Sequence, residues 1–227
     1  MRAVLPAWLA RYSLDHLDAL WETQVRTPLY YCAFLYDDAS ILRHLHDRGR
    51  LLSRWMFWTP AIRVGKMDVI AYLCSVADAR AEPRLMATAA ECGNLELVLY
   101  LAHQGCDATD ALNMACKHGH LAIAQRLHAL GLGAWDPKVL GSVASRGHLD
   151  VLCSLHDHGY AGFSSSTLTA AAANGHLDIV LFLCQHRHEA RLDTALVAAA
   201  TNGHVHVVRW LDQQTNASAV LRDRGSV

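Results

Sequence analysis

The chain has 227 residues, and its 20 lysines and arginines against 21 aspartates and glutamates give a formal net charge of −1 at pH 7. This balance supplies no field that would gather nucleic acid or an anionic membrane surface. No apolar run approaches the roughly 18 residues that a membrane-spanning helix requires. We therefore expect neither a nucleic-acid partner nor a membrane partner.

Residues 1–27 are predicted to form an N-terminal capping helix region. Apolar side chains recur through this segment and suit one or two helices that cover the first repeat, as the end of a repeat stack requires. These side chains are Trp8, Leu9, Tyr12, Leu14, Leu17, Leu20 and Trp21. Arg11 interrupts the short apolar run at the start, which argues against a secretory signal. Because no acid occurs before Asp15, organelle targeting stays open as an alternative.

A fixed period governs residues 28–214. A glycine, or Asp37 in the first copy, marks each copy, and the marks lie 28, 28, 26, 28, 28 and 28 residues apart. The marks are Asp37, Gly65, Gly93, Gly119, Gly147, Gly175 and Gly203. A leucine stands eight residues after each of them, at Leu45, Leu73, Leu101, Leu127, Leu155, Leu183 and Leu211. A period in this range indicates a solenoid of stacked repeats.

Each copy contains two predicted helices on either side of the mark. After Gly147, apolar residues at Val151, Leu152 and Leu155 follow the spacing of one helix face. Before the mark lies an alanine-rich helix, such as residues 168–173, whose small side chains allow close helix packing. The mark itself supplies the left-handed residue that ends this first helix.

The fold class that follows is all-α, an α-solenoid of about seven stacked helix–turn–helix repeats. Each predicted helix has only about eight to ten residues, below the roughly 12–15 at which an isolated helix persists in water. Stability must therefore come from stacking. We expect distortion in the first two copies, because Asp37 replaces the turn glycine and Pro60 falls inside a first helix.

Residues 215–227 are predicted to be a polar C-terminal tail. The last copy would leave an apolar end at Val205, Val207, Val208 and Trp210 unless this tail folds back over it. An uncovered apolar end promotes association. We therefore expect a monomer unless the C-terminal end is uncovered.

Residues 194–211 resemble an ankyrin repeat, whose pattern is T-P-L-H-x-A-A-x-x-G-H-x-x-V-V-x-x-L. The segment keeps the threonine, the paired alanines, the Gly-His step, the paired valines and the final leucine. It departs at Ala195 and Val197, which stand where the family has proline and histidine, and its period is about 28 rather than 33 residues. The resemblance implies that the β-hairpin fingers between repeats are reduced or absent.

The resemblance also implies a function: a non-catalytic protein–protein interaction module, a scaffold or adaptor, that binds a protein partner through its concave helical face. The end of each first helix faces the concave side in this family. The implied partner-binding residues are Tyr36, Arg63, Glu91, Lys117, His118, Ser145, Arg146, Asn174 and Asn202. The alternatives are that these are solvated helix ends and that the chain is a structural segment of a larger ankyrin array.

An enzymatic or metal-binding role is the remote alternative. Histidine follows the mark at His120, His148, His176 and His204, but equivalent positions in adjacent copies lie roughly 10 Å apart, too far to share a metal. We expect these histidines to bond to turn backbone and tie repeats together. The H-E-x-x-H motif that begins at His188 fails because position 192 is Leu192, and neither a G-x-S-x-G elbow nor a P-loop occurs. We predict no catalytic residue, no metal ligand and no cofactor.

Seven cysteines are scattered over different repeat columns. Two that share a column, Cys74 and Cys184, stand four copies apart, far beyond disulfide reach. Reduced thiols favour a cytoplasmic location.

Overall fold

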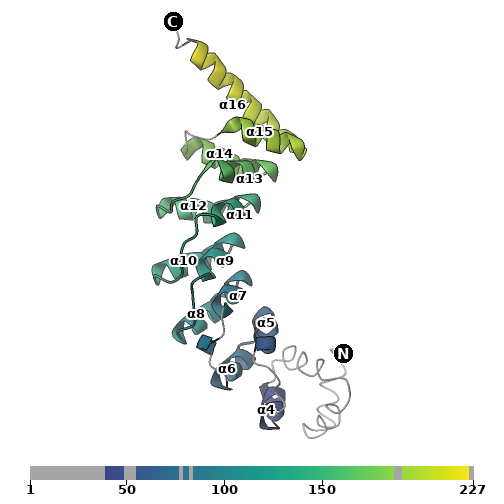
Figure 1. Ribbon diagram of the computed structural model, residues 1–227, viewed down its shortest axis with the longest axis vertical. Helices are drawn as coiled ribbons and strands as arrows, with labels where there is room; N and C mark the ends of the chain where they lie inside the picture. Colours follow the sequence, from purple (N-terminus) through teal and green to yellow (C-terminus); the bar gives the residue numbers. More distant parts are fainter. Residues whose placement is uncertain (1–38, 49–54, 77–78, 82–83, 187–190, 225–227) are drawn as a thin grey trace. The chain divides into compact units, whose positions relative to one another are not determined.

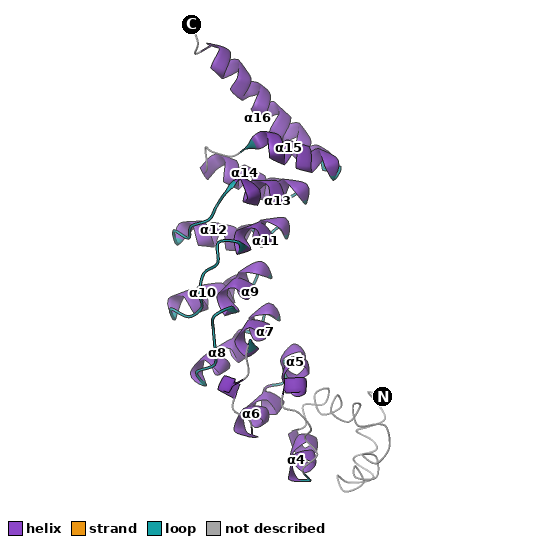
Figure 2. Cartoon of the chain, in the orientation of Figure 1, coloured by secondary structure: helices purple, strands orange, loops and turns teal. Residues whose placement is uncertain are grey.

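The computed structural model describes residues 39–48, 55–76, 79–81, 84–186 and 191–224. Within these ranges the regular elements are all helices, and no strand occurs (Figures 1 and 2). The first unit's helices are α4 (Ala39–Asp47), α5 (Trp55–Val64), α6 (Met67–Val76), the 3-10 helix η2 (Ala79–Ala81), α7 (Leu85–Glu91) and α8 (Leu95–His103). They are followed by α9 (Ala111–Lys117), α10 (Leu121–Ala129), α11 (Val139–Ser145), α12 (Leu149–Asp157), α13 (Ser165–Ala173), α14 (Leu177–His186), α15 (Leu192–Thr201) and α16 (Val205–Arg224).

The chain divides into two compact units, Met1–Ala111 and Leu112–Val227. In the first unit α5 packs against α7, and α4 against α6. In the second, α11, α13 and α15 pack in succession, while α10 packs against α12 and α14 against α16. First helices thus form one layer and second helices another within each unit (Figure 1). This arrangement confirms the all-α solenoid of helix–turn–helix repeats, and the described residues hold no β-hairpin finger.

The leucine eight residues after each mark lies in the core. Among the described side chains, all six such leucines are buried, at Leu73, Leu101, Leu127, Leu155, Leu183 and Leu211. The apolar residues four and five after the mark are buried beside them, as Val151 and Leu152 show. The predicted apolar face of the second helices is therefore confirmed. The capping region at residues 1–27 and the mark at Asp37 lie outside the described residues.

The first helices of both units bury a large side chain seven residues before the mark and small ones closer to it. In the first unit Met86 is buried with Ala89 and Ala90. In the second, Leu168 is buried with Ala171 and Ala172. Helix α5 also runs through Pro60 without interruption, so the distortion expected there does not break the helix.

Each described mark glycine ends its first helix in the left-handed conformation. Gly65, Gly93, Gly119, Gly147, Gly175 and Gly203 have φ between 70° and 81°. The next residue then donates its backbone N–H to a carbonyl five residues back, as His176 does to Ala171 at 3.0 Å, which is the hydrogen bond of a Schellman motif. The second helix begins one residue later. The turn therefore depends on glycine because other residues rarely adopt positive φ.

Histidines that follow the mark reach back to the preceding repeat. Nε2 of His176 donates to the Ser145 carbonyl at 3.1 Å, and Nε2 of His204 donates to the Ala173 carbonyl at 3.0 Å. The His176 ring lies over the preceding mark so closely that a Cβ on Gly147 would stand 2.7 Å from its Cε1. The predicted role of these histidines as ties between repeats is confirmed for His176 and His204.

The last helix is longer than the others. α16 has 20 residues and ends at Arg224, so it spans both sides of the boundary predicted at residue 214. At about 1.5 Å per residue this corresponds to about 30 Å of helix. Even so, no helix in the described ranges is long and apolar enough to cross a bilayer.

Candidate functional site

We call the residues at the ends of the first helices, Arg63, Glu91, Lys117, His118, Ser145, Arg146, Asn174 and Asn202, the helix-end row. Tyr36, also predicted for it, lies outside the described residues. In the first unit Arg63 is exposed near the end of α5, and Glu91 is half-buried as the last residue of α7. The first unit therefore contributes one charge of each sign.

The second unit brings two members of the helix-end row together. Arg146, the C-cap of α11, donates from Nη1 to Nδ1 of His118 at 3.4 Å across 28 positions of sequence. This bond requires that Nδ1 of His118 carry no proton. The His118 ring also lies parallel to that of His120, with centroids 6.5 Å apart. Neighbouring repeats thus share a polar contact at the row.

The remaining members of the row in this unit bond to their own helices. Asn174 and Asn202, both exposed C-caps, each donate from Nδ2 to the carbonyl four residues earlier at 2.9 Å. Ser145 donates from Oγ to the Ser142 carbonyl at 3.0 Å. These local bonds hold the three neutral side chains of the row against their own helices.

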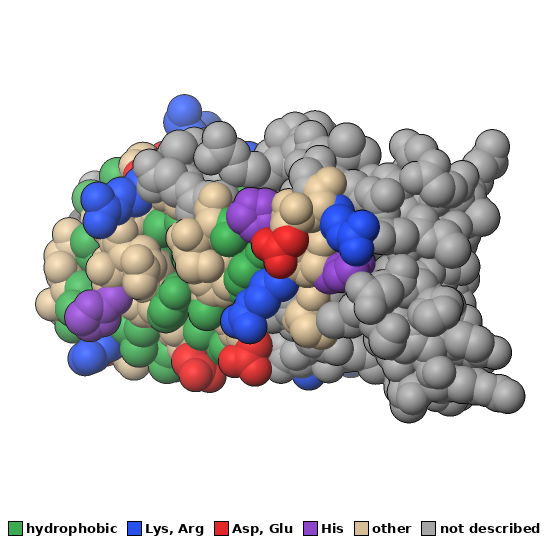
Figure 3. Space-filling view, turned by 90° about the horizontal axis from the view of Figure 1, so that it is seen from below, with side chains coloured by type: hydrophobic (Ala, Val, Ile, Leu, Met, Phe, Trp, Pro, Cys, Tyr) green, Lys and Arg blue, Asp and Glu red, His purple; other side chains and the backbone are tan. Residues whose placement is uncertain are grey.

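Charge distribution separates the two units. The charged residues of the row in the second unit, Lys117 and Arg146, are both basic. Lys117 is half-buried and Arg146 exposed. The face of the molecule seen in Figure 3 instead mixes basic, acidic and histidine side chains without a continuous area of one sign.

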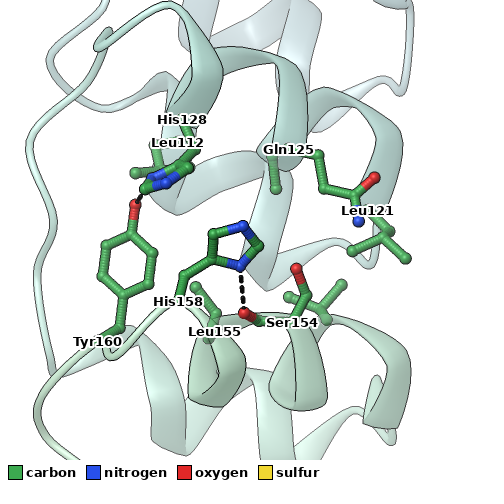
Figure 4. Close-up of a pocket in the computed structure, with 10 residues that line it drawn as sticks. Leu112, Leu121, Gln125, His128, Ser154, Leu155, His158 and Tyr160 are labelled. Atoms are coloured by element: carbon green, nitrogen blue, oxygen red, sulfur yellow. Dashed lines mark hydrogen bonds between the residues drawn. The ribbon is translucent and has the colours of Figure 1, made fainter.

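A shallow pocket lies elsewhere in the second unit, between α10 and α12 (Figure 4). It is lined by Leu112, Leu121, Ala124, Gln125, His128, Val151, Ser154, Leu155, His158 and Tyr160. Its empty volume of about 260 Å³ includes open solvent. The enclosed space is therefore smaller than this volume.

Two imidazoles and a phenol hold this pocket together. Nδ1 of His158 donates to the Ser154 carbonyl at 2.6 Å, and Nδ1 of His128 is hydrogen-bonded to the Tyr160 hydroxyl. The rings of His128 and His158 meet edge to face with centroids 4.6 Å apart. Trp135 packs on Tyr160 and donates from Nε1 to the Ala161 carbonyl at 3.2 Å. The contacts fasten the loop after α12 to the preceding repeat.

The same contact recurs one repeat later. His156 lies 28 positions after His128, and His186 lies 28 after His158. Their ring centroids are 4.8 Å apart. Within the His156–His158 pair, one ring therefore contacts the following repeat and the other the preceding repeat. The sequence signal for this column is histidine at both nine and eleven residues after a mark.

The chemistry of these groups does not indicate catalysis. The pocket lining holds no carboxylate, and burial, followed by the charge of Cys116, raises the pKa of the Tyr160 hydroxyl. Burial raises the pKa of Cys74 to about 11 and that of Cys116 to about 12, so both thiols stay protonated at neutral pH. Among the described residues no three histidine, cysteine or acidic side chains lie close enough to hold a metal ion.

Comparison with known proteins bears on the second unit. Residues 140–223 match the family model described as ankyrin repeats (3 copies). The matched segment runs from α11 to the end of α16 and includes Ser145, Arg146, Asn174 and Asn202 of the helix-end row. No curated protein matches the chain.

Proposed function

Because residues 140–223 are ankyrin repeats, and such repeats are generally protein–protein interaction modules, we propose that this chain is a non-catalytic scaffold or adaptor. The proposed contact surface is the helix-end row. The family is typically non-catalytic. All six cysteines in the described residues are free thiols, which supports a reducing, cytoplasmic setting.

One observation carries the proposal: in the second unit the side chains of Arg146 and His118 are in contact at 3.4 Å, and Lys117 directly precedes His118 in the sequence. All three side chains offer donors at the C-terminal ends of α9 and α11. The negative end of each helix dipole stabilises the charges of Lys117 and Arg146 locally. They do not need an acid from the protein itself to be accommodated there. We infer that the partner presents carboxylates to this stretch, because charge complementarity governs which partners such a surface admits.

The amides beyond the cations suit a different part of the same partner. Asn174 and Asn202 are held by bonds to their own helices and repeat at the spacing of one copy. Their remaining donors and acceptors can pair with the backbone of a peptide or loop. The proposed partner segment is therefore acidic where it meets α9 and α11, and neutral where it meets α13 and α15.

The test is a pull-down from the source cell with the intact chain and the Lys117→Glu/Arg146→Glu variant. We expect a partner that the intact chain retains to be lost from the variant, because two attractive contacts become repulsive. Purified complex should then lose affinity as salt is raised, since exposed charges are screened.

The matched control is Arg126→Glu/Lys138→Glu. It changes the net charge by the same amount at two exposed residues outside the row. Circular dichroism should show both variants folded. If the control lost the partner as readily as the row variant, only net charge would matter. If neither lost it, the row would not be the contact surface.

A further inference from the structure

The contact between Arg146 and His118 depends on the protonation state of the imidazole. Nη1 of Arg146 donates to Nδ1 of His118 at 3.4 Å, so the ring accepts at Nδ1 and is neutral. An imidazolium carries a proton on each nitrogen and has no acceptor left. Protonation of His118 therefore breaks this bond and places a second cation beside the guanidinium.

Further basic groups lie around this pair within the second unit. Lys117, the last residue of α9, directly precedes His118. The His120 ring lies parallel to that of His118, with centroids 6.5 Å apart. The His148 ring lies over Gly119, where an added Cβ would stand 2.5 Å from its Nδ1. The position of His118 is therefore one at which positive charge gathers as the pH falls, because histidine gains its charge between about pH 8 and pH 5.

One carboxylate acts on the same neighbourhood. Asp150, in the first turn of α12, favours positive charge on His148, against the charges of Arg146, His120 and His176. The ion pair formed by described residues elsewhere in the chain joins Arg84 to Asp110, and among those residues no carboxylate lies within 4.0 Å of the Arg146 guanidinium. Arg146 is thus held by a neutral base rather than by an acid.

We infer that His118 controls the availability of Arg146, and that the acidic partner binds with uptake of a proton by His118. The inference rests on the function proposed above for the helix-end row. Neutral His118 occupies one N–H of the guanidinium. Protonated His118 releases it, and a partner carboxylate can then accept charge-assisted hydrogen bonds from both side chains. Because binding and protonation favour each other, the affinity for the partner rises as the pH falls.

The pH dependence is confined to one part of the helix-end row. The amides of Asn174 and Asn202 stay neutral at every pH in this range. The partner should therefore respond to pH where it meets α9 and α11, and not where it meets α13 and α15.

The test is the affinity of the full chain for an octa-aspartate peptide, measured by isothermal titration calorimetry from pH 7.5 to pH 5.5. The peptide stays ionised throughout, since the pKa of aspartate is about 3.9. We expect the dissociation constant to fall at least about fivefold, because one linked proton allows up to about tenfold per pH unit. Titrations in buffers of different ionisation enthalpy should show proton uptake on binding. Circular dichroism at each pH checks that the chain stays folded.

Three variants assign the effect. His118→Gln should bind the peptide with one affinity at every pH, because an amide takes up no proton. His120→Gln is the matched control and should keep the pH dependence, since it removes a neighbouring histidine that lies outside the helix-end row. Lys117→Glu/Arg146→Glu should not bind the peptide at any pH.

Two results would overturn the inference and leave the helix-end row as a contact surface: a dissociation constant that does not change with pH, or a dependence that His118→Gln leaves intact. If the natural chain bound the peptide at no pH, the inference would fail because the row would not accept carboxylates. The pull-down with Lys117→Glu/Arg146→Glu would still decide separately whether the row contacts a partner, so the two failures are distinguishable.

Discussion

The turns of the two units have the same backbone conformation, but the side chain that follows the mark glycine differs. In the first unit Asn94 follows the mark and accepts from the Leu97 N–H at 2.9 Å, so it caps the helix that it begins. In the second unit His176 and His204 instead donate to carbonyls of the preceding repeat. Both residue types make the same backbone bond five residues back. The glycine thus sets the backbone of the turn. The side chain of the next residue then forms a hydrogen bond either within its own helix, as Asn94 does, or to the preceding repeat, as His176 and His204 do.

The two turns also differ in how closely a side chain of the next repeat approaches the mark glycine. A Cβ on Gly65 would lie 3.2 Å from Nδ2 of Asn94, whereas one on Gly147 would lie 2.7 Å from the His176 ring. The turn at Gly147 is therefore the more crowded of the two.

The largest expected effect tests whether the leucine eight residues after the mark forms the core in both units. Leu101→Ala and Leu155→Ala each remove a buried leucine of the same column, one in each unit. Each should lower the free energy of unfolding by about 2–5 kcal/mol. Hydrogen exchange read by mass spectrometry should place the loss in the unit that carries the change. A loss under about 1 kcal/mol would mean that the column does not form the core.

Next in size is the effect of adding a methyl group at the turn. Gly147→Ala should destabilise by about 1–3 kcal/mol from crowding against His176, in addition to the strain of positive φ. Gly159→Ala is the matched control, since Gly159 has φ of 71° but no atom within 4 Å of its Cβ position. Urea denaturation measures both. Equal losses in the free energy of unfolding would show that the His176 ring does not crowd a methyl group at position 147.

Removing the ties themselves should cost less. Asn94→Ala loses a helix cap, and His176→Ala loses one hydrogen bond, so each should destabilise by about 1 kcal/mol. The two differ in their coupling to glycine. His176→Ala should reduce the penalty of Gly147→Ala in a double-mutant cycle, because the ring that crowds the methyl group is gone. Additive losses would contradict the contact.

The smallest expected effect is a pH dependence that only the second unit shows. Burial, followed by the charges of Arg146, His120 and His176, lowers the pKa of His148, against the opposing charge of Asp150. His148 therefore binds a proton more readily in the unfolded chain than in the folded chain. Stability is complete above the ordinary histidine pKa of about 6.5 and falls as the pH drops through the lowered folded value.

Thermal melts between pH 8 and pH 5 measure this dependence. His148→Gln should flatten the dependence of the melting temperature on pH. A curve that His148→Gln leaves unchanged would assign the titration to another group.

The columns that were predictable from sequence are those in which one residue type alone satisfies the geometry. Glycine at positive φ and leucine in the core belong to this class, and the histidine ties followed from the recurring Gly-His step. The His128–His158 contact was not predictable, because it joins residues 30 positions apart whose meeting depends on how each helix is rotated. The Arg146–His118 bond was missed although the two residues stand one period apart, since spacing alone does not say whether side chains converge.

The C-terminal helix was missed for a different reason. The stretch after Leu211 is polar, and polarity was interpreted as a tail. No glycine or proline interrupts the sequence from Val205 to Arg224, and Gly225 follows the last helical residue. The absence of a helix-breaking residue was the better guide.

Because Cys116 is buried, its reaction with a thiol reagent can report local opening of the second unit. The side chain is fully buried in α9, and its pKa of about 12 keeps the sulfur in the unreactive thiol form. Exposed Cys92 in the first unit has no such shelter from solvent. An alkylating reagent would therefore reach Cys92 in the native protein but reach Cys116 only in molecules whose α9 has transiently separated from its neighbours. The rate at which Cys116 is alkylated therefore measures how often α9 separates from its neighbours.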